Sequence, residues 1–558
     1  MFANPQSLSP VLLTGLSLLC STNTSAAPGR PVAVVGVAQP GAVSNVDRIA
    51  MPQSVSAAER PPPSQPPFAL TSPDGQGLQL RKVEARIALD GPLAWTELWL
   101  TFHNSENRVR EGRFTITLPP DASMGRFAMR IGSQWMDGEV VEKHAAQVAY
   151  EDFLHARQDP AILTKDAGNV FSARVFPIGA AADKELVVAW AQVLADPRAP
   201  YVLPLRGLPV VPQLVVRAWQ HRLGQTPQPL VAASLQDSRP AQDLYINLPA
   251  LAADDGGARR DGVVAVGRVT VDQPDSAAPF GELLVLFDTS ASAGPTFEQR
   301  LRTLGHLVAL AAAHGATAIQ VVAFDQVRLP VFTGAPALFG AKELAVLRAR
   351  GALGASDLGA ALRTVVGSSA GAKRVVVMSD CMPTMGTTDL ADLTAIAALL
   401  DKARVQRLDV VLPAGARNDA LGRALASAGL PQPGAAIGGD QPPLHRLTRS
   451  VLPRVQVAVQ GAAWVWPQTV DALQAGDAVV VAAGVPPAQP FVVQFRGGAH
   501  GEVMLTAHPG SPALLARLGA AAQVALLESR HAAAPAADKP ALAKLLVPRY
   551  TGFDRSAR

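Results

Sequence analysis

The feature that most constrains the fold is an alternation of buried strands and helices between residues 281 and 429. Near-continuous apolar runs such as ELLVLF, AIQVVAF and RVVVM are separated by longer segments in which apolar residues recur at helical spacing. Strands buried on both faces have this composition, and strands that alternate with helices form a parallel sheet covered on both sides. The sequence therefore predicts an α/β doubly wound (Rossmann-like) domain over residues 280–440.

Oxygen-bearing side chains follow several strands of this predicted sheet. Asp288, Ser290 and Ser292 stand in DTSAS directly after the first strand, Ser356 precedes a helix in GALGASDLG, and Asp380 ends VVVMSD. Ligand sites of doubly wound sheets lie beyond the carboxyl ends of the strands, so we expect these side chains to meet at one rim. Carboxylate and hydroxyl oxygens are hard ligands that suit Mg²⁺, Mn²⁺ or Ca²⁺. The sequence predicts a divalent cation site made of these five residues.

Such a site favours adhesion over catalysis. Neutral hydroxyls hold a cation without cancelling its charge, so a protein partner's Asp or Glu carboxylate can complete the coordination shell. We therefore expect a non-enzymatic adhesion or scaffold protein. Two alternatives stay open: a structural envelope module whose metal site is empty, its polar residues merely capping helices, and a hydrolase. The sequence contains neither a G-x-S-x-G elbow nor an H-E-x-x-H helix in support of the hydrolase.

The order of DTSAS, Ser356 and Asp380 in their strand, loop and helix context resembles a von Willebrand factor type A (VWA) domain. The resemblance implies that these residues form a metal-ion-dependent adhesion site. Ser356 stands where the family mostly has Thr, and Cys381 follows Asp380 where the family usually has Gly. The single thiol of Cys381 is a small buried residue or, alternatively, a nucleophile. Asp325 and Asp357 are either acids near the site or ordinary loop and helix-start residues.

Residues 67–196 predict an antiparallel β domain, because apolar and polar residues alternate through segments such as TELWLTFHN and FTITLPP. Apolar residues at near-helical spacing in GEVVEKHAAQVAYEDF (138–153) predict one helix inside it. These segments, with GNVFSARVFPI, resemble the vault protein inter-alpha-trypsin (VIT) domain, which implies a compact beta-sandwich without catalytic residues. His144 and Tyr150 on the predicted helix are interpreted as structural because no nucleophile motif accompanies them.

Further strand patterns predict a beta-rich extension at residues 197–279 and a C-terminal beta region with a helix at 441–558. The tail PALAKLLVPRYTGF resembles the end of inter-alpha-trypsin inhibitor heavy-chain-like proteins. Taken together, the resemblances imply a heavy-chain-like protein of bacterial type, with a VIT domain followed by a VWA domain. The family's Asp-Pro-His-Phe motif for coupling to a glycosaminoglycan is missing, so that coupling is not expected.

The first residues predict export. VLLTGLSLL is too short to span a bilayer and is followed by small residues, which is typical of a signal peptide over residues 1–27. Residues 28–66 predict a Pro-rich disordered linker. We expect a periplasmic, cell-surface or secreted protein with no transmembrane segment in the mature chain. A formal net charge of +4 over 558 residues argues against nucleic-acid binding, and two cysteines exclude a disulfide framework.

Overall fold

The computed structural model describes most of the chain between residues 49 and 533. The described residues are 49–50, 66–75, 77–119, 122–137, 139–142, 162–165, 168–194, 200–221, 226–247, 257–271, 275–367, 372–439, 442–452, 454–497 and 501–533. The predicted signal peptide and the C-terminal tail lie outside them. Among the described residues, no helix has the length and apolar character needed to cross a membrane.

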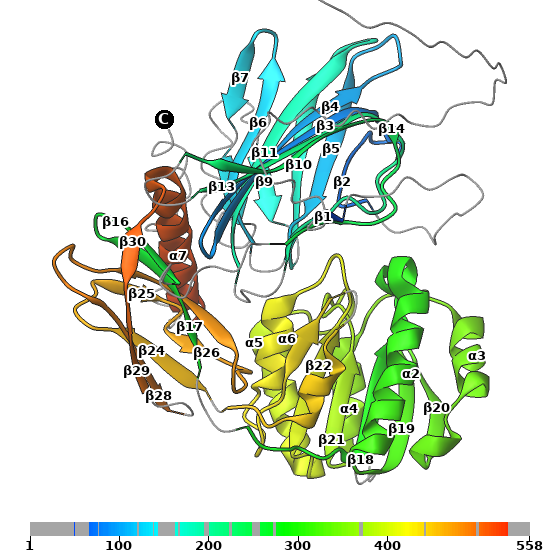
Figure 1. The fold of residues 1–558 in the computed structure, drawn as a ribbon. Coiled ribbons are helices and arrows are strands. Elements are labelled where there is room, and N and C mark those ends of the chain that lie inside the picture. The colour runs from blue at the N-terminus through cyan, green and yellow to red at the C-terminus, as the bar shows by residue number, and fades with distance from the viewer. Residues whose placement is uncertain are drawn as a thin grey trace, which may run out of the picture.

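The first domain is built around two large β-sheets (Figure 1). The five-stranded sheet runs β2 (Phe68–Thr71), β5 (Arg110–Thr117), β10 (Val170–Ile178), β9 (Ile162–Lys165) and β8 (Glu139–Glu142). The seven-stranded sheet runs β14 (Gln228–Ser238), β13 (Val211–His221), β3 (Gln79–Asp90), β4 (Leu93–His103), β11 (Asp183–Val193), β6 (Ala122–Ile131) and β7 (Gln134–Asp137).

One hydrophobic core joins these two sheets. Phe114 of β5 and Val175 of β10 belong to the same buried cluster as Leu98 of β4 and Leu186 of β11. Burial alternates along β4 as the period-two sequence pattern requires, because successive side chains of a strand point to opposite faces.

The predicted helix over residues 138–153 is wrong where the structure describes it. Residues 139–142 form strand β8, which pairs in parallel with β9 and places Val141 opposite Thr164. A short apolar run fits strand and helix patterns equally well, and the available sheet edge decides between them here. Residues 143–161, including His144 and Tyr150, lie outside the described residues.

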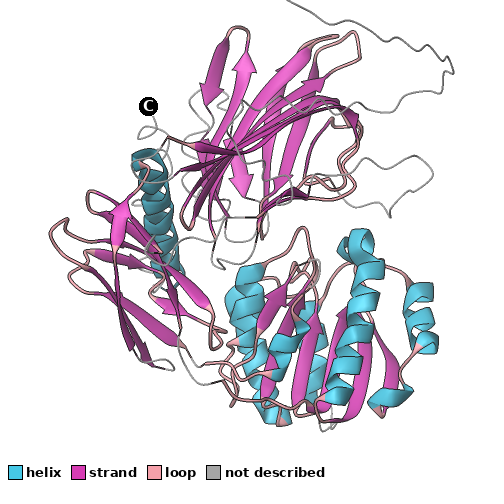
Figure 2. Ribbon diagram, viewed as in Figure 1, coloured by secondary structure: helices cyan, strands magenta, loops and turns pink. Residues whose placement is uncertain are grey.

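The second domain contains a six-stranded sheet with helices on both faces (Figure 2). Its strand order is β20 (Arg328–Gly334), β19 (Ala316–Phe324), β18 (Gly281–Asp288), β21 (Arg374–Met378), β22 (Arg407–Leu412) and β23 (Ala436–Gly438). Numbered along the chain, this is the order 3-2-1-4-5-6 of doubly wound folds. All neighbouring pairs are parallel except β19 with β20. The sequence predicted no strand at β20, which contains Pro330 and lies at the sheet edge, where proline is tolerated.

The helices of this domain are divided between the two faces of the sheet. Leu283, Val285 and Phe287 share a core cluster with helix α2, whereas Leu284 and Leu286 share the opposite cluster with α4 to α6. The chain changes face between β18 and β21, so this pair is the topological switch point. The helices are α2 (Phe297–Ala313), α3 (Ala341–Arg350), α4 (Leu358–Gly367), α5 (Leu390–Ala398) and α6 (Asp419–Ala426), with short 3₁₀ helices η2 (Ala291–Thr296), η3 (Pro336–Leu338), η4 (Leu399–Ala403) and η5 (Leu444–Thr448).

A third domain combines segments from before and after the second. One sheet contains β25 (Trp464–Trp466), β27 (Ala478–Gly484), β17 (Val264–Thr270), β16 (Ala258–Asp261) and β30 (Ala507–Pro509). The other contains β26 (Thr469–Val470), β24 (Val455–Val459), β28 (Phe491–Gly497) and β29 (Gly501–Leu505), and helix α7 (Pro512–Ala533) follows.

Residues 197–279, which we expected to form one extension, are divided between domains. Strands β13 and β14 complete the seven-stranded sheet, whereas β16 and β17 belong to the third domain. Strand β15 (Leu244–Ile246) pairs with β12 (Tyr201–Leu203) and with β1 (Ile49–Ala50). The predicted linker therefore contributes a two-residue strand, because backbone pairing with β15 is available to it.

Helix α7 packs between the first and third domains (Figure 1). Leu515 and Leu518 of α7 share an apolar cluster with Leu93 of β4 and Val266 of β17. Burial of apolar side chains from three elements in one cluster fixes these two domains against each other.

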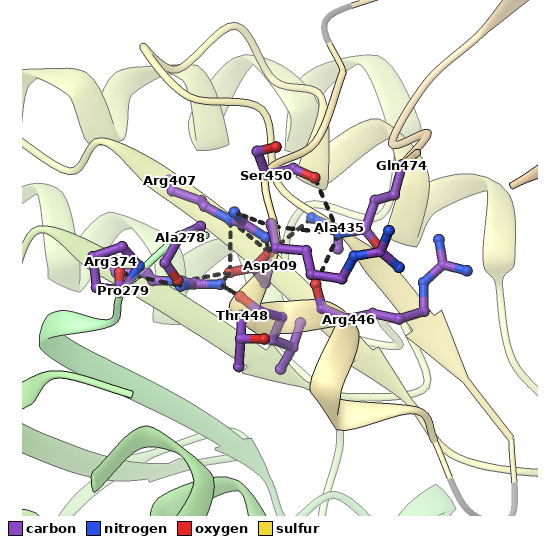
Figure 3. A network of polar contacts seen from close by, with 12 residues as sticks. Ala278, Pro279, Arg374, Arg407, Asp409, Ala435, Arg446, Thr448, Ser450 and Gln474 are labelled. Atoms are coloured by element: carbon purple, nitrogen blue, oxygen red, sulfur yellow. Dashed lines mark hydrogen bonds and ion pairs between the residues drawn. The ribbon is translucent and has the colours of Figure 1, made fainter. Parts of the chain in front are cut away.

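Buried charges hold the amino edge of the parallel sheet (Figure 3). Asp409 of β22 pairs with Arg374 of β21 at 2.7 Å and with Arg407 of its own strand at 2.8 Å. The two guanidinium groups also donate to main-chain carbonyls of the segments that enter and leave the domain: Ala278, Pro279, Leu447 and Arg449. This network ties the sheet to both of its connections.

Candidate metal centre

The five predicted ligands come from three loops at the carboxyl edge of the sheet. Asp288 ends β18, and Asp380 follows β21 by two residues. These two strands are paired, with Phe287 opposite Met378, so the carboxylates leave the sheet at adjacent positions. The structure buries four of the five side chains, whereas Ser292 is exposed: the buried ones are Asp288, Ser290, Ser356 and Asp380. The site therefore consists of four buried side chains and one exposed serine.

Two pairs of ligand oxygens have the spacing of neighbouring ligands on one ion. The hydroxyl oxygens of Ser290 and Ser292 are 3.1 Å apart. The Ser356 hydroxyl donates to Asp288 Oδ2 at 3.2 Å. Adjacent ligands of an octahedral Mg²⁺ with bonds of about 2.0 to 2.1 Å lie about 3 Å apart. The structure thus brings Asp288 to Ser356, and Ser290 to Ser292, at distances compatible with a shared cation.

Asp380 bonds a different set of donors. Its Oδ1 accepts from the Met382 amide at 3.0 Å, and its Oδ2 accepts from Arg300 Nη2 at 3.2 Å. Arg300 comes from α2 and is 5% exposed. The chain itself thus supplies one positive charge to this carboxylate.

Burial raises the pKa of Asp288 above its ordinary value, and the neighbouring negative charge of Asp380 raises that pKa further. Arg300 and the hydrogen bonds from Ser290 and Ser379 act in the opposite direction. The Coulombic effect of Asp380 on Asp288 places both carboxylates in one electrostatic site, where an added cation is favourable.

Sequence reasoning missed two residues of this site. The Ser379 hydroxyl donates to Asp288 Oδ2 at 2.6 Å and accepts from the Cys381 amide at 3.0 Å. Its only signal was its place directly before Asp380. Arg300 carried a clearer signal, because it lies three residues after Phe297 and four before Leu304, on the apolar face of the predicted helix.

Cys381 is buried, as the structural interpretation of this thiol predicted. Burial raises its pKa well above the ordinary value, and the carboxylates of Asp380 and Asp288 add to the effect. A protonated, inaccessible thiol is a poor nucleophile. Its φ of +55° is in the left-handed region that favours glycine, so the loop keeps a glycine-type conformation although the residue has a side chain.

The two further acids have local partners. Asp325 pairs with Arg350 at 2.5 Å and accepts from the Thr289 hydroxyl at 3.1 Å. Asp357 accepts from the Ala360 amide at 2.9 Å, which caps the first turn of α4. The helix-start interpretation of Asp357 is therefore confirmed, and Asp325 anchors the loop between α3 and the site.

The donor set fits a hard divalent cation. Within the described part of the chain, no group of three or more His, Cys, Asp or Glu side chains is arranged to hold a metal, so hydroxyls are needed to complete a site. Serine oxygens beside two carboxylates provide them, and oxygen ligands select Mg²⁺, Mn²⁺ or Ca²⁺ over softer metals. Two carboxylates and one guanidinium also leave one formal negative charge for a cation to neutralise.

The first domain touches the loop beside this site. The Asn169 amide donates to the Arg417 carbonyl at 3.2 Å, and the Arg417 amide donates to Asn169 Oδ1 at 3.0 Å. The next residue, Asn418, donates its amide to the Asp380 carbonyl at 2.8 Å. Main-chain hydrogen bonds therefore connect the first domain to the loop that carries Asp380.

Comparison with known families identifies one segment of the chain. Residues 80–189 match the model of the vault protein inter-alpha-trypsin domain. The match lies within the first domain and confirms the VIT resemblance there. No curated protein matches the chain.

Solved structures with some similarity include the ArnB paralog VWA2 from Sulfolobus acidocaldarius, with 13% identity and a TM-score of 0.25 over 54% of this chain and 89% of that one. The manganese-loaded Plasmodium vivax TRAP protein has 14% identity and a TM-score of 0.24 over 45% and 100%. Proximal thread matrix protein 1 of the mussel byssus, with a zinc-occupied MIDAS motif, has 15% identity and a TM-score of 0.24 over 30% and 46%.

Proposed function

We propose that this protein is an exported, non-enzymatic adhesion or scaffold protein of the inter-alpha-trypsin inhibitor heavy-chain-like, bacterial type. Its VWA-like second domain binds a protein partner's Asp or Glu carboxylate through a divalent cation, Mg²⁺ or alternatively Mn²⁺ or Ca²⁺. The observation that carries the proposal is the oxygen spacing at the switch point between β18 and β21: 3.1 Å between Ser290 and Ser292, and 3.2 Å between Ser356 and Asp288.

The residues divide into two roles. The hydroxyls of Ser290, Ser292 and Ser356 hold the cation as neutral ligands, and Asp288 and Asp380 supply the negative charge that retains it. A divalent cation bound there supplies an electrophilic position for an incoming carboxylate. Ser292 is exposed, so the hydroxyl side of the site faces the solvent from which a partner arrives.

The rim of the site supports a protein as the partner. Leu353 is 69% exposed and Met385 is 43% exposed. Both belong to loops bonded to the site, because the Leu353 amide donates to the Thr289 carbonyl and the Met385 amide donates to the Ser356 carbonyl. Exposed apolar side chains around a polar centre provide the contact area that a single coordination bond lacks.

A structural module without a resident metal is the second candidate. The observation that favours it is the ion pair between Arg300 and Asp380, since a guanidinium supplies one positive charge without any metal. Equilibrium dialysis with Mg²⁺ or Mn²⁺ separates the two candidates, because only the adhesive one requires an ion.

The adhesion proposal is tested by a pull-down from envelope extract with wild type, Asp288→Ala and Ser290→Ala, each with Mg²⁺ and with excess EDTA. We expect a partner to be retained by wild type with Mg²⁺ and lost in the other conditions. Asp401→Ala is the matched control, because Asp401 is an exposed acid of the same domain. Partner binding that survives both site variants and EDTA contradicts the proposal.

A further inference from the structure

Arg300 is a cation buried on the apolar face of α2. It occupies a position on the apolar face of α2 beside Phe297, Leu301 and Leu304, where an aliphatic side chain is compatible with burial. Burying a guanidinium costs free energy unless it is paired and fully hydrogen-bonded. The presence of Arg300 therefore calls for a reason other than the stability of the helix.

The hydrogen bonds of this guanidinium are incomplete. Its Nε donates to the Thr296 hydroxyl at 3.1 Å, and its Nη2 donates to Asp380 Oδ2 at 3.2 Å. Its Nη1 is buried without a hydrogen-bond partner. Buried donors are almost always satisfied, so the orphaned Nη1 marks a group held in the site by charge rather than by a complete network.

Arg300 and a bound cation would both interact with the carboxylate of Asp380. Asp380, whose Oδ2 accepts from Arg300, is also one of the predicted ligand residues of the metal centre. In a buried site of low effective dielectric, a fixed positive charge next to the ligands repels a divalent ion. Arg300 also lines a small pocket beside the site, together with Gln299, Thr303 and Ser379.

We propose that Arg300 sets the cation affinity of this site by competing with the ion for Asp380. The inference rests on the proposed function and deepens it. When no ion is bound, the positive charge of Arg300 offsets part of the repulsion between the carboxylates of Asp288 and Asp380. The same positive charge repels a cation and so weakens its binding. An ion that does bind shares Asp380 with Arg300, retains more of its own charge, and attracts a partner carboxylate more strongly.

The experiment measures Mn²⁺ binding to the full chain by titration calorimetry and by the electron paramagnetic resonance signal of free Mn²⁺. Arg300→Gln removes the charge and keeps polar atoms, and Arg300→Met is the second neutral variant because position 300 lies on the apolar face of α2. Arg300→Lys keeps the charge. Arg302→Gln is the matched control, since Arg302 is an exposed arginine of the same helix.

We expect at least about tenfold tighter Mn²⁺ binding by the two neutral variants than by wild type. Arg300→Lys should stay within about threefold of wild type because it keeps the positive charge beside Asp380. Arg302→Gln should stay within the same range because the charge of an exposed arginine is screened by solvent and salt. Unchanged or weaker binding by the neutral variants overturns the proposal. Tighter binding by Arg300→Lys, equal to that of the neutral variants, also overturns it.

The result distinguishes this inference from the proposed function. Binding by wild type with no gain in the neutral variants overturns the role of Arg300 and leaves the metal centre standing. Binding by the neutral variants alone supports the role of Arg300 and argues that the wild-type site is the metal-free module. Absence of binding in every variant, with folded protein verified by circular dichroism, overturns both.

Discussion

The two edges of the parallel sheet both bury charged side chains, and they treat them in opposite ways. At the amino edge, Arg374 and Arg407 surround Asp409, which leaves a formal charge of +1. At the carboxyl edge, the ion pairs among the described residues give Asp288 and Asp380 one guanidinium, that of Arg300, which leaves a formal charge of −1. The excess positive charge at the amino edge is stabilised by hydrogen bonds to main-chain carbonyls, including those of Leu447 and Arg449. The surplus at the carboxyl edge faces neutral hydroxyls.

This difference separates a structural network from a binding site. A charge cluster whose surplus is satisfied by main-chain groups has no chemical reason to admit a ligand. A cluster whose surplus charge faces neutral hydroxyls, with ligand oxygens about 3 Å apart, is complete only when something else binds. We therefore expect substitutions at the amino edge to change stability and substitutions at the carboxyl edge to change binding.

The largest expected effect is at the amino edge. Asp409→Ala leaves two buried guanidinium groups without their carboxylate, so we expect a loss of about 3 to 5 kcal/mol in the free energy of unfolding. Denaturant unfolding followed by circular dichroism measures it. The exposed control Asp401→Ala should change stability by no more than about 0.5 kcal/mol. A loss below about 1 kcal/mol for Asp409→Ala would show that the network is not structural.

A smaller effect is expected where the first domain touches the carboxyl edge. Gly168 has a φ of +59°, and a Cβ there would lie 2.1 Å from the Arg417 carbonyl oxygen. Gly168→Ala should therefore separate Asn169 from Arg417, cost about 1 to 2 kcal/mol, and speed amide hydrogen exchange in the loop at 413–419.

Gly132→Ala is the control for this contact. Gly132 has nearly the same φ, +60°, but a Cβ there meets nothing within 4 Å. It should carry the backbone penalty without the clash, so hydrogen exchange at 413–419 should stay at the wild-type rate. Equal exchange in both variants would mean that the first domain does not hold this loop.

At the carboxyl edge, Asp288→Asn should be nearly neutral for stability in EDTA, within about 1 kcal/mol, because it removes one of two neighbouring buried charges. The same variant should lose the rise in melting temperature that Mg²⁺ or Mn²⁺ gives to wild type. Differential scanning calorimetry with and without the ion measures both. A loss comparable to that of Asp409→Ala would erase the contrast between the edges.

The smallest expected effect is at Cys381. Replacement by glycine relieves a positive φ, which is worth about 1 to 2 kcal/mol, and removes a small buried side chain of similar value. We expect a net change within about 1 kcal/mol in chemical unfolding. A loss above about 3 kcal/mol in the free energy of unfolding would mean that the thiol makes packing contacts in the Asp380 loop that glycine cannot replace.

Much of the α/β domain and its site was predictable from local pattern. The buried strands, the helices between them and the polar residues after β18 and β21 are consecutive in the chain, and strand order then requires Asp288 and Asp380 to lie side by side. The regions where prediction failed depend on distant pairing. Strand β8 forms by pairing with β9, which would otherwise be the edge strand of its sheet. Strand β16 belongs to a sheet in which β25, β27 and β30 lie about 200 residues or more after it in the chain.

In the α/β domain, the sequence by itself determined the buried strands, the helices between them and the candidate ligands, because hydrophobic period and residue chemistry are local properties. The helical spacing that sets Arg300 on the face of Phe297 and Leu304 is also present in the sequence, although sequence reasoning did not single this residue out. Only the tertiary structure decided that this arginine meets Asp380, that Ser379 meets Asp288, and that Asn169 of the first domain contacts Arg417 beside the site. The physical reason is that helical spacing specifies which face is buried, whereas the partner on that face depends on how separate elements pack.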